Sequence, residues 1–238
     1  MVSQLQSSSQ SEIFYPESDG KPMADNTKQF RWIVVIQQNL DWLFADRADV
    51  FVAGDLLWYP VEGSRDICTA PDVLVVFGRP KGDRGSYKQW MEDNVAPQVV
   101  FEILSPSNTQ TEMNKKLVFY NRHSIEEYYV YDPDSNDLGG WLRVDGNLDV
   151  IDPVDQWTSP RLGIRFNLSG AELQILRPDD KPFLSYVEIA QRAEQTEQQL
   201  EQTEQQLEQT EQQLEQERSR AQALAERLRA LGIDPDQV

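Results

Sequence analysis

The chain has 238 residues, 26% of them charged, and a formal net charge of −18 at pH 7. This length suits one sizeable domain with an extension, and the acidic balance argues against general nucleic-acid binding. Cys68 is the single cysteine and His123 the single histidine, which excludes an internal disulfide and a cysteine-based or histidine-rich metal site. The sequence has no signal-peptide pattern and no apolar run long enough to span a bilayer, so we expect a cytoplasmic protein outside the membrane.

The N-terminal part predicts a disordered segment, a loop and a helix. Residues 1–14 are rich in Ser and Gln, which favours disorder, and Glu17 follows within a Glu-Ser-Asp-Gly turn. Between Thr27 and Phe44, apolar side chains recur at helical spacing: Trp32, Ile36, Leu40 and Leu43. We expect this helix to pack on a sheet.

Short runs rich in β-branched and aromatic residues predict the strands, because they are too short for buried helices. A second helix is predicted over Thr109–Arg122, with Ser107 or Asn108 able to cap its start. The order of these elements predicts one α/β domain over residues 15–185. The predicted strands are Val50–Trp58, Val73–Phe77, Val99–Leu104, Glu127–Asp132, Gly140–Val144, Leu148–Ile151, Leu162–Phe166 and Glu172–Leu176.

Two carboxylates belong to the central strands. Asp72 begins the run 73–77, and Glu102 interrupts the run 99–104, where a carboxylate is costly unless it is paired or binds a metal. If these strands are neighbours, both carboxylates can meet at one edge of the sheet. Together with a backbone carbonyl, that of Ile103, and water molecules, they would suit Mg²⁺, with Mn²⁺ as an alternative. Such a metal could polarise a phosphoryl oxygen and activate water, and a nearby lysine could orient that water or offset charge on the phosphate.

At this point the chain resembles a known family. From about Tyr15 to Tyr186 it closely resembles the Uma-type family of restriction endonucleases, a former domain of unknown function in the PD-(D/E)XK nuclease superfamily. The resemblance implies a restriction-endonuclease-like mixed sheet flanked by helices and metal-dependent hydrolysis of phosphodiester bonds in DNA. The residues that carry it are Pro71-Asp72, Glu102, Ser105-Pro106-Ser107, Glu112, Lys116-Leu117-Val118-Phe119-Tyr120, Glu127-Tyr128 and Asp132-Pro133.

The lysine departs from the superfamily pattern. The usual lysine lies two residues after the glutamate, and this position is Leu104. The resemblance implies that the helix supplies the lysine instead, with Lys116 ahead of Lys115. Glu112 stands where the family usually has aspartate, and its spacing from Lys116 also allows a simple surface salt bridge. Family members carry an acid near Glu17, which could be an extra metal-site acid, although a turn residue is the simpler interpretation.

A basic loop joins the two strands that carry the acids. It runs from Gly78 to Trp90 and is the one basic stretch in an acidic chain. Contact with nucleic-acid phosphates is one interpretation, and a solvated surface loop is the other, and the sequence favours neither. The basic residues are Arg79, Lys81, Arg84 and Lys88.

Residues 186–231 form a repetitive tail. The segment Glu-Gln-Thr-Glu-Gln-Gln-Leu repeats with a seven-residue period, and this favours a coiled coil over a solvated single helix. Threonine at three d positions predicts a weak seam. We therefore expect homo-oligomers through the tail, the domain or both, and a disordered end over residues 232–238. The a positions are Tyr186, Ala193, Leu200, Leu207, Leu214, Ala221 and Leu228, and the d positions are Ile189, Thr196, Thr203, Thr210, Glu217, Leu224 and Leu231.

These patterns favour a metal-dependent endodeoxyribonuclease with Asp72 and Glu102 as metal ligands. The alternative is a non-catalytic nucleic-acid-binding or scaffold protein assembled through its coiled coil. Two intact acids favour the enzyme, whereas the acidic net charge and Leu104 favour the scaffold.

Overall fold

The computed structural model describes residues 13–18, 20 and 22–230. Residues 1–12 and 231–238 lie outside this description, so most of the predicted disordered N-terminus and the whole predicted disordered end are not tested. The chain divides into two units, residues 1–185 and residues 186–238.

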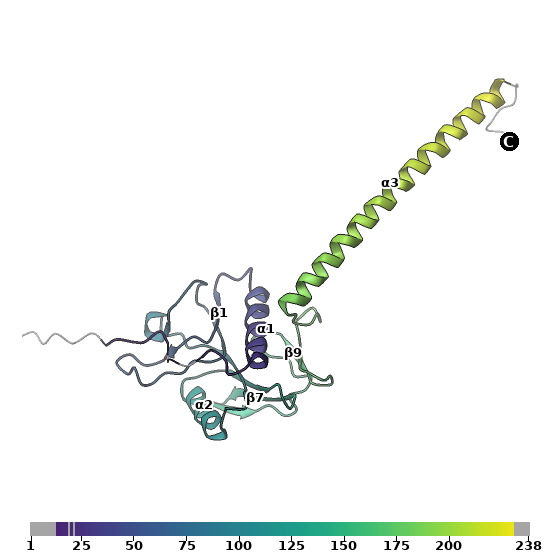
Figure 1. Ribbon diagram of the computed structural model, residues 1–238. Coiled ribbons are helices and arrows are strands. Elements are labelled where there is room, and N and C mark those ends of the chain that lie inside the picture. Colours follow the sequence, from purple (N-terminus) through teal and green to yellow (C-terminus); the bar gives the residue numbers. More distant parts are fainter. Residues whose placement is uncertain (1–12, 19, 21, 231–238) are drawn as a thin grey trace, which may run out of the picture. The chain divides into compact units, whose positions relative to one another are not determined.

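The first unit is built on a six-stranded mixed sheet with the strand order β1-β3-β5-β6-β7-β8. Figure 1 labels β1 and β7 of this sheet together with α1 and α2. The β5–β6 pair is parallel, and the other neighbours in this sheet are antiparallel. Helix α2 (Gln110–Arg122) lies between β5 and β6 in the sequence and makes the crossover that a parallel pair requires. The strands are β1 (Val50–Gly54), β3 (Val73–Phe77), β5 (Val99–Ile103), β6 (Glu127–Asp132), β7 (Asp137–Val144) and β8 (Asn147–Val150).

Smaller elements complete the unit. They are β2 (Trp58–Tyr59), which pairs with β4 (Tyr87–Lys88), the 3-10 helix η1 (Gln89–Met91), and β9 (Arg165–Asn167), which pairs with β10 (Gln174–Leu176). The predicted single strand over 50–58 is wrong, because the chain leaves β1 at Asp55, whose φ of 47° is incompatible with a strand. The predicted strands at 162–166 and 172–176 are shorter in the structure.

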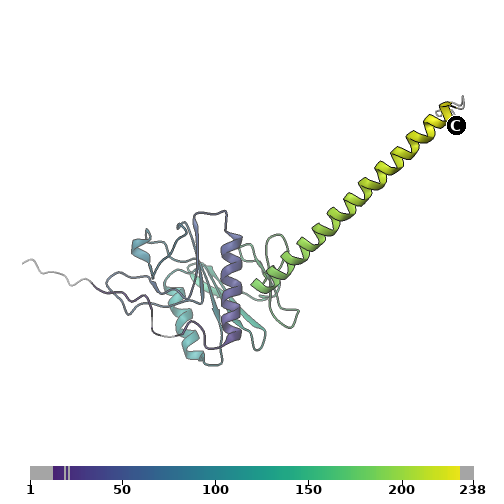
Figure 2. The ribbon, with the colours of Figure 1, turned by 45° about the horizontal axis from the view of Figure 1, so that its top comes forward.

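The two faces of the sheet carry separate apolar cores. Helix α1 (Thr27–Leu43) buries its apolar stripe, including Trp32, Ile36 and Leu40, against one face. Helix α2 covers the other face, where Tyr120 packs with Leu74 and Tyr128. Figure 2 gives a second view of α1 and α2 against the sheet. These contacts confirm the predicted α/β class and the predicted packing of the first helix.

The register of β3 and β5 positions the two acids. Val73 pairs with Phe101 and Leu74 pairs with Val100, so Asp72, one residue before β3, stands across from Glu102 near the end of β5. Alternate residues of a strand face the same side of a sheet, so Asp72 and Glu102 share the side of Leu74 and Val100, which is the α2 side. The prediction that these strands are neighbours is therefore confirmed.

The second unit contains helix α3 (Tyr186–Ala230), which is 45 residues long. Most of its larger apolar side chains are exposed in the single chain, with Leu200, Leu207 and Leu214 at 58%, 60% and 52%. The helical prediction is confirmed, and the coiled coil stays a prediction. A search of the described residues finds no helix with the length and apolarity needed to cross a membrane.

Candidate active site

Asp72 has a buried carboxylate that accepts a hydrogen bond from the end of the neighbouring strand β5. The backbone N–H of Ile103 donates to Asp72 Oδ2 over 2.6 Å. Burial, and next the negative charge of Glu102, raise the pKa of Asp72 well above its usual value. A nearby cation would therefore favour the ionised form of Asp72.

Glu102 is held through both carboxylate oxygens by α2. Only 2% of this residue is exposed. Lys116 Nζ donates to Oε2 over 2.6 Å, and the Tyr120 hydroxyl donates to Oε1. Lys116 and Tyr120 are four residues apart, so one face of α2 presents both donors. The Tyr120 hydroxyl was not assigned a role from the sequence, although its spacing from Lys116 was a usable signal.

The charges around Lys116 keep it protonated. Burial alone would lower the pKa of Lys116, but the negative charges of Glu102 and Asp72 outweigh burial and raise it. Burial, followed by the charge of Glu102, also raises the pKa of Tyr120 well above its usual value. Both groups therefore remain hydrogen-bond donors to Glu102 at neutral pH.

The start of α2 differs from the prediction. Thr109 is the N-cap, because its side chain accepts a hydrogen bond from the Glu112 N–H over 3.2 Å, whereas Ser107 or Asn108 was expected there. The simple Glu112–Lys116 surface pair is also wrong, since Lys116 bonds to the buried Glu102. Lys115 is exposed and does not line the cleft described next, so its position gives no support to a catalytic role.

A cleft of about 510 Å³ opens above Asp72 and Lys116. Its walls also include Asp25, Asp55 and Glu112, and Lys116 is the only basic residue among the described residues that line it. Such a surface repels a phosphate unless a cation is present. The charge pattern of the cleft therefore matches a site that works with a bound metal ion.

Ser107, the last residue of the Ser105-Pro106-Ser107 segment, lines the cleft. The hydroxyls of Ser105 and Ser107 both donate to Asp25 Oδ2, the first over 2.7 Å. The Ser105 N–H is held by Asn108 Oδ1 over 2.8 Å. This segment therefore ties the end of β5 to the chain just before α1, a contact that the sequence pattern alone did not predict.

The donor atoms at the site suit a hard divalent cation. Within residues 13–18, 20 and 22–230, no three His, Cys, Asp or Glu side chains form a group that could hold a metal ion. A metal would therefore need the Ile103 carbonyl and water molecules beside the carboxylates of Asp72 and Glu102. This all-oxygen set fits Mg²⁺ or Mn²⁺, and a cation would relieve the repulsion that contributes to the raised pKa of Asp72.

The family described as "Uma2: Putative restriction endonuclease" matches residues 20–171. The chain belongs to this family. Among solved structures, the chain is similar to a putative nuclease of DUF820 from Anabaena variabilis ATCC 29413, with 20% identity and a TM-score of 0.47. That similarity covers 62% of this chain and 81% of the other. A comparison with curated proteins finds no match.

The Uma2 match begins after Glu17 and ends before α3. Glu17 is exposed, does not line the cleft, and its carboxylate lies against Gly85. Its position therefore favours the turn interpretation over an extra metal-site acid.

The Uma2 match does include the basic loop, where two arginines are bound to a carboxylate of the protein itself. Arg79 and Arg84 donate to the two oxygens of Glu92 over 2.9 and 2.7 Å, and both side chains are largely buried. The Arg84 guanidinium also lies 3.9 Å from the centre of the Phe51 ring. These contacts stabilise the loop and partly neutralise both arginines, and phosphate binding by Arg79 and Arg84 stays a prediction.

The two lysines of the loop have other contacts, and Lys81 is more exposed than the arginines. Lys81 pairs with Asp41 over 2.7 Å, and Lys88 lies 5.6 Å from the Tyr15 ring centre. Neither lysine lines the cleft. Phosphate binding by Lys81 and Lys88 stays a prediction.

Proposed function

We propose that this Uma2-family chain is a metal-dependent endonuclease that hydrolyses phosphodiester bonds in DNA. One observation carries the proposal: two buried carboxylates, Asp72 and Glu102, stand across from each other at neighbouring strand ends, with Lys116 bonded to one of them. The nuclease description of the family supports the same reaction class. Mg²⁺, or Mn²⁺, would be held by both carboxylates and the Ile103 carbonyl.

The bound metal would supply positive charge that polarises a phosphoryl oxygen and lowers the pKa of an attacking water. The residues of the chain have separate tasks. Asp72 and Glu102 provide the negative charge that retains the cation, and Tyr120 keeps Glu102 oriented. Because its pKa is raised, Lys116 acts as a cationic donor that orients water or offsets charge on the phosphate, and not as a general base.

A non-catalytic binding or scaffold protein remains the second candidate. The pairing of Arg79 and Arg84 with Glu92 favours it, because Glu92 partly neutralises two cations of the predicted DNA surface. The acidic cleft also disfavours nucleic acid in the absence of a metal. The two candidates differ in one measurable property, metal-dependent strand cleavage.

The test combines cleavage with metal binding. Purified full-length protein is incubated with plasmid DNA, single-stranded DNA and RNA in Mg²⁺, Mn²⁺ or EDTA, and its melting temperature is recorded with and without metal. We expect cleavage of DNA in metal only and a metal-induced rise in melting temperature, both lost in Asp72→Asn. Asp145→Asn, in the exposed turn after β7, makes the same substitution away from the cleft and should behave as wild type. Cleavage that survives in Asp72→Asn would exclude this site, and metal binding without cleavage would favour the scaffold.

We also propose that α3 pairs with a second copy of the chain as a parallel coiled coil. The hydroxyls of Thr196, Thr203 and Thr210 each donate over 2.8 Å to the carbonyl four residues earlier, so these d positions can turn methyl groups to a partner. With the leucines at a, position g carries Arg192, and the next e position carries Glu197, which meet between chains in a parallel pair. An antiparallel pair would instead place glutamates of the e positions near one another.

Light scattering at several concentrations tests the pairing. Leu207→Glu with Leu214→Glu should give a monomer, because each substitution puts a charge in the seam. Gln205→Glu with Gln212→Glu adds the same charge on the outer face of the helix and should leave the association intact. Truncation after residue 190 should also weaken it. Equal monomeric masses for the full-length and truncated chains would contradict the coiled coil.

A further inference from the structure

At the end of β5, on the side of the strand that faces β3, side chains form the hydrogen bonds that a longer β3 would provide. The pairing of β3 with β5 ends at Val73 and Phe101, so Ile103 extends beyond it. Its N–H donates to Asp72 Oδ2 over 2.6 Å, and its carbonyl accepts from Gln29 Nε2 over 2.8 Å. Both contacts are buried. Asp72, one residue before β3, and Gln29 of α1 thus both form hydrogen bonds with the backbone of Ile103.

The orientation of the Gln29 amide follows from its second contact. Gln29 Oε1 accepts a hydrogen bond from the Asp25 N–H over 2.8 Å. Because a backbone N–H can only donate, the amide oxygen must face Asp25, and the NH₂ group must face the Ile103 carbonyl. The Asn26 side chain caps the same turn by accepting from the Gln29 N–H over 2.8 Å. The amide is therefore oriented from both ends.

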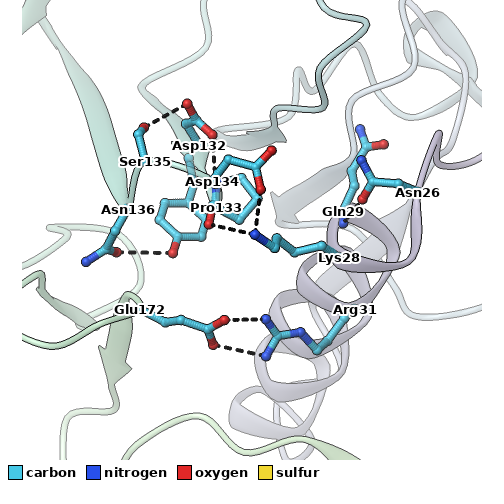
Figure 3. Close-up of polar contacts among 11 residues, drawn as sticks. Asn26, Lys28, Gln29, Arg31, Asp132, Pro133, Asp134, Ser135, Asn136 and Glu172 are labelled. Atoms are coloured by element: carbon cyan, nitrogen blue, oxygen red, sulfur yellow. Dashed lines mark hydrogen bonds and ion pairs between the residues drawn. The ribbon is translucent and has the colours of Figure 1, made fainter.

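Helix α1 is itself fastened near this turn, as Figure 3 shows. Lys28 donates to Asp134 over 2.5 Å, in the turn that follows β6. Arg31 makes two hydrogen bonds to Glu172, over 2.6 and 3.0 Å. These contacts lie one residue before and two residues after Gln29, so they restrain the part of α1 that carries it.

We propose that Gln29 is a positioning residue for the metal site. A carbonyl oxygen has two lone pairs, and Gln29 occupies one of them. The other stays available to a cation held by Asp72 and Glu102, and Gln29 itself lines the cleft beside Asp72. By fixing the direction of the carbonyl, Gln29 prepares the third protein ligand before the metal arrives. This inference rests on the metal site of the proposed function.

The experiment measures metal affinity in the folded full-length protein. Gln29→Met keeps the length of the side chain and removes its donor, and Gln38→Met makes the same change at an exposed position of α1. Calorimetric titration with Mn²⁺ should give a Kd raised about 10- to 100-fold in Gln29→Met, the usual effect of losing a residue that orients a metal ligand. Gln38→Met should match wild type. Should Gln29→Met fail to fold, Gln29→Asn provides the same test, because its shorter amide cannot reach both Asp25 and Ile103.

The outcomes separate this inference from the proposed function. If Gln29 served only to satisfy a buried carbonyl, its loss would lower stability in EDTA but leave the Mn²⁺ Kd of the folded protein unchanged. Wild-type Kd in both Gln29 variants, with binding lost in Asp72→Asn, would overturn the positioning role and leave the metal site in place. Absence of Mn²⁺ binding in the wild type would overturn both.

Discussion

Lys116→Met should destabilise the metal-free protein, because it removes the cation bonded to a buried carboxylate. Glu102 is 2% exposed, and Lys116 Nζ lies 2.6 Å from its Oε2. Removing one partner of a buried ion pair costs about 3–5 kcal/mol. The Lys116 side chain is 21% exposed, so solvent screens part of the interaction, and we expect the lower end, about 3 kcal/mol at pH 7. The unpaired Glu102 would also face Asp72 without a compensating charge.

Urea unfolding in EDTA measures this effect through a double-mutant cycle. The cycle compares Lys116→Met, Glu102→Gln and the double variant, and we expect a coupling free energy of about 2–3 kcal/mol. Lys115→Met is the matched control on the exposed face of α2 and should stay within about 0.5 kcal/mol of wild type. The folded protein raises the pKa of Lys116, so its stabilising contribution is fully present below about pH 10 and lost as the pH rises through the folded pKa. Measurements at pH 7 therefore include the full stabilising contribution of Lys116.

Equal stability of Lys116→Met and Lys115→Met would refute the reasoning, because Glu102 would then not depend on a charged partner. Mn²⁺ should restore part of the stability of Lys116→Met by supplying the missing positive charge. Cleavage by this variant should fall while its metal-induced rise in melting temperature persists, since Lys116 is not a metal ligand. A Lys115 variant with the greater loss of cleavage would overturn the choice of lysine.

The remaining predictions concern the basic loop and the start of α2. Arg84→Met should lower the free energy of unfolding at pH 7 by about 2 kcal/mol, because Glu92 loses a guanidinium partner. The hydrogen bond from Arg84 is the main cause that lowers the pKa of Glu92. The loss of unfolding free energy in Arg84→Met should therefore shrink as the pH falls below about 4, and a loss independent of pH would contradict the pairing. Neutralising Lys81 and Lys88 together should weaken DNA binding and flatten its salt dependence in a titration of labelled DNA, and an unchanged slope would exclude phosphate contact. Thr109→Ala should cost about 1 kcal/mol in urea unfolding through loss of the N-cap, and no loss would contradict it.

The sequence by itself determined the central strands and the first helix, and it predicted that the two acids can meet at one edge of the sheet. The apolar runs at 73–77 and 127–132 coincide with β3 and β6, and the helical spacing from Thr27 coincides with α1. Local geometry explains this success, because a strand or helix displays its buried face as a period in the sequence. For the same reason the sequence predicted that Asp72 and Glu102 lie close together, because each belongs to a short apolar run that is expected to form a buried strand.

Only the tertiary structure decided which partners the charged side chains take. Local spacing allowed Lys116 to pair with Glu112, but the buried Glu102 takes its ammonium group, because an unpaired carboxylate costs more inside the protein than at its surface. The arginines of the basic loop have Glu92 as their partner for a related reason, since their side chains are largely buried. Gln29 reaches Ile103 across 74 positions of sequence, a distance over which no local period operates. The choice of partner depends on burial and on distances in space, and neither can be derived from the spacing of neighbouring residues in the sequence.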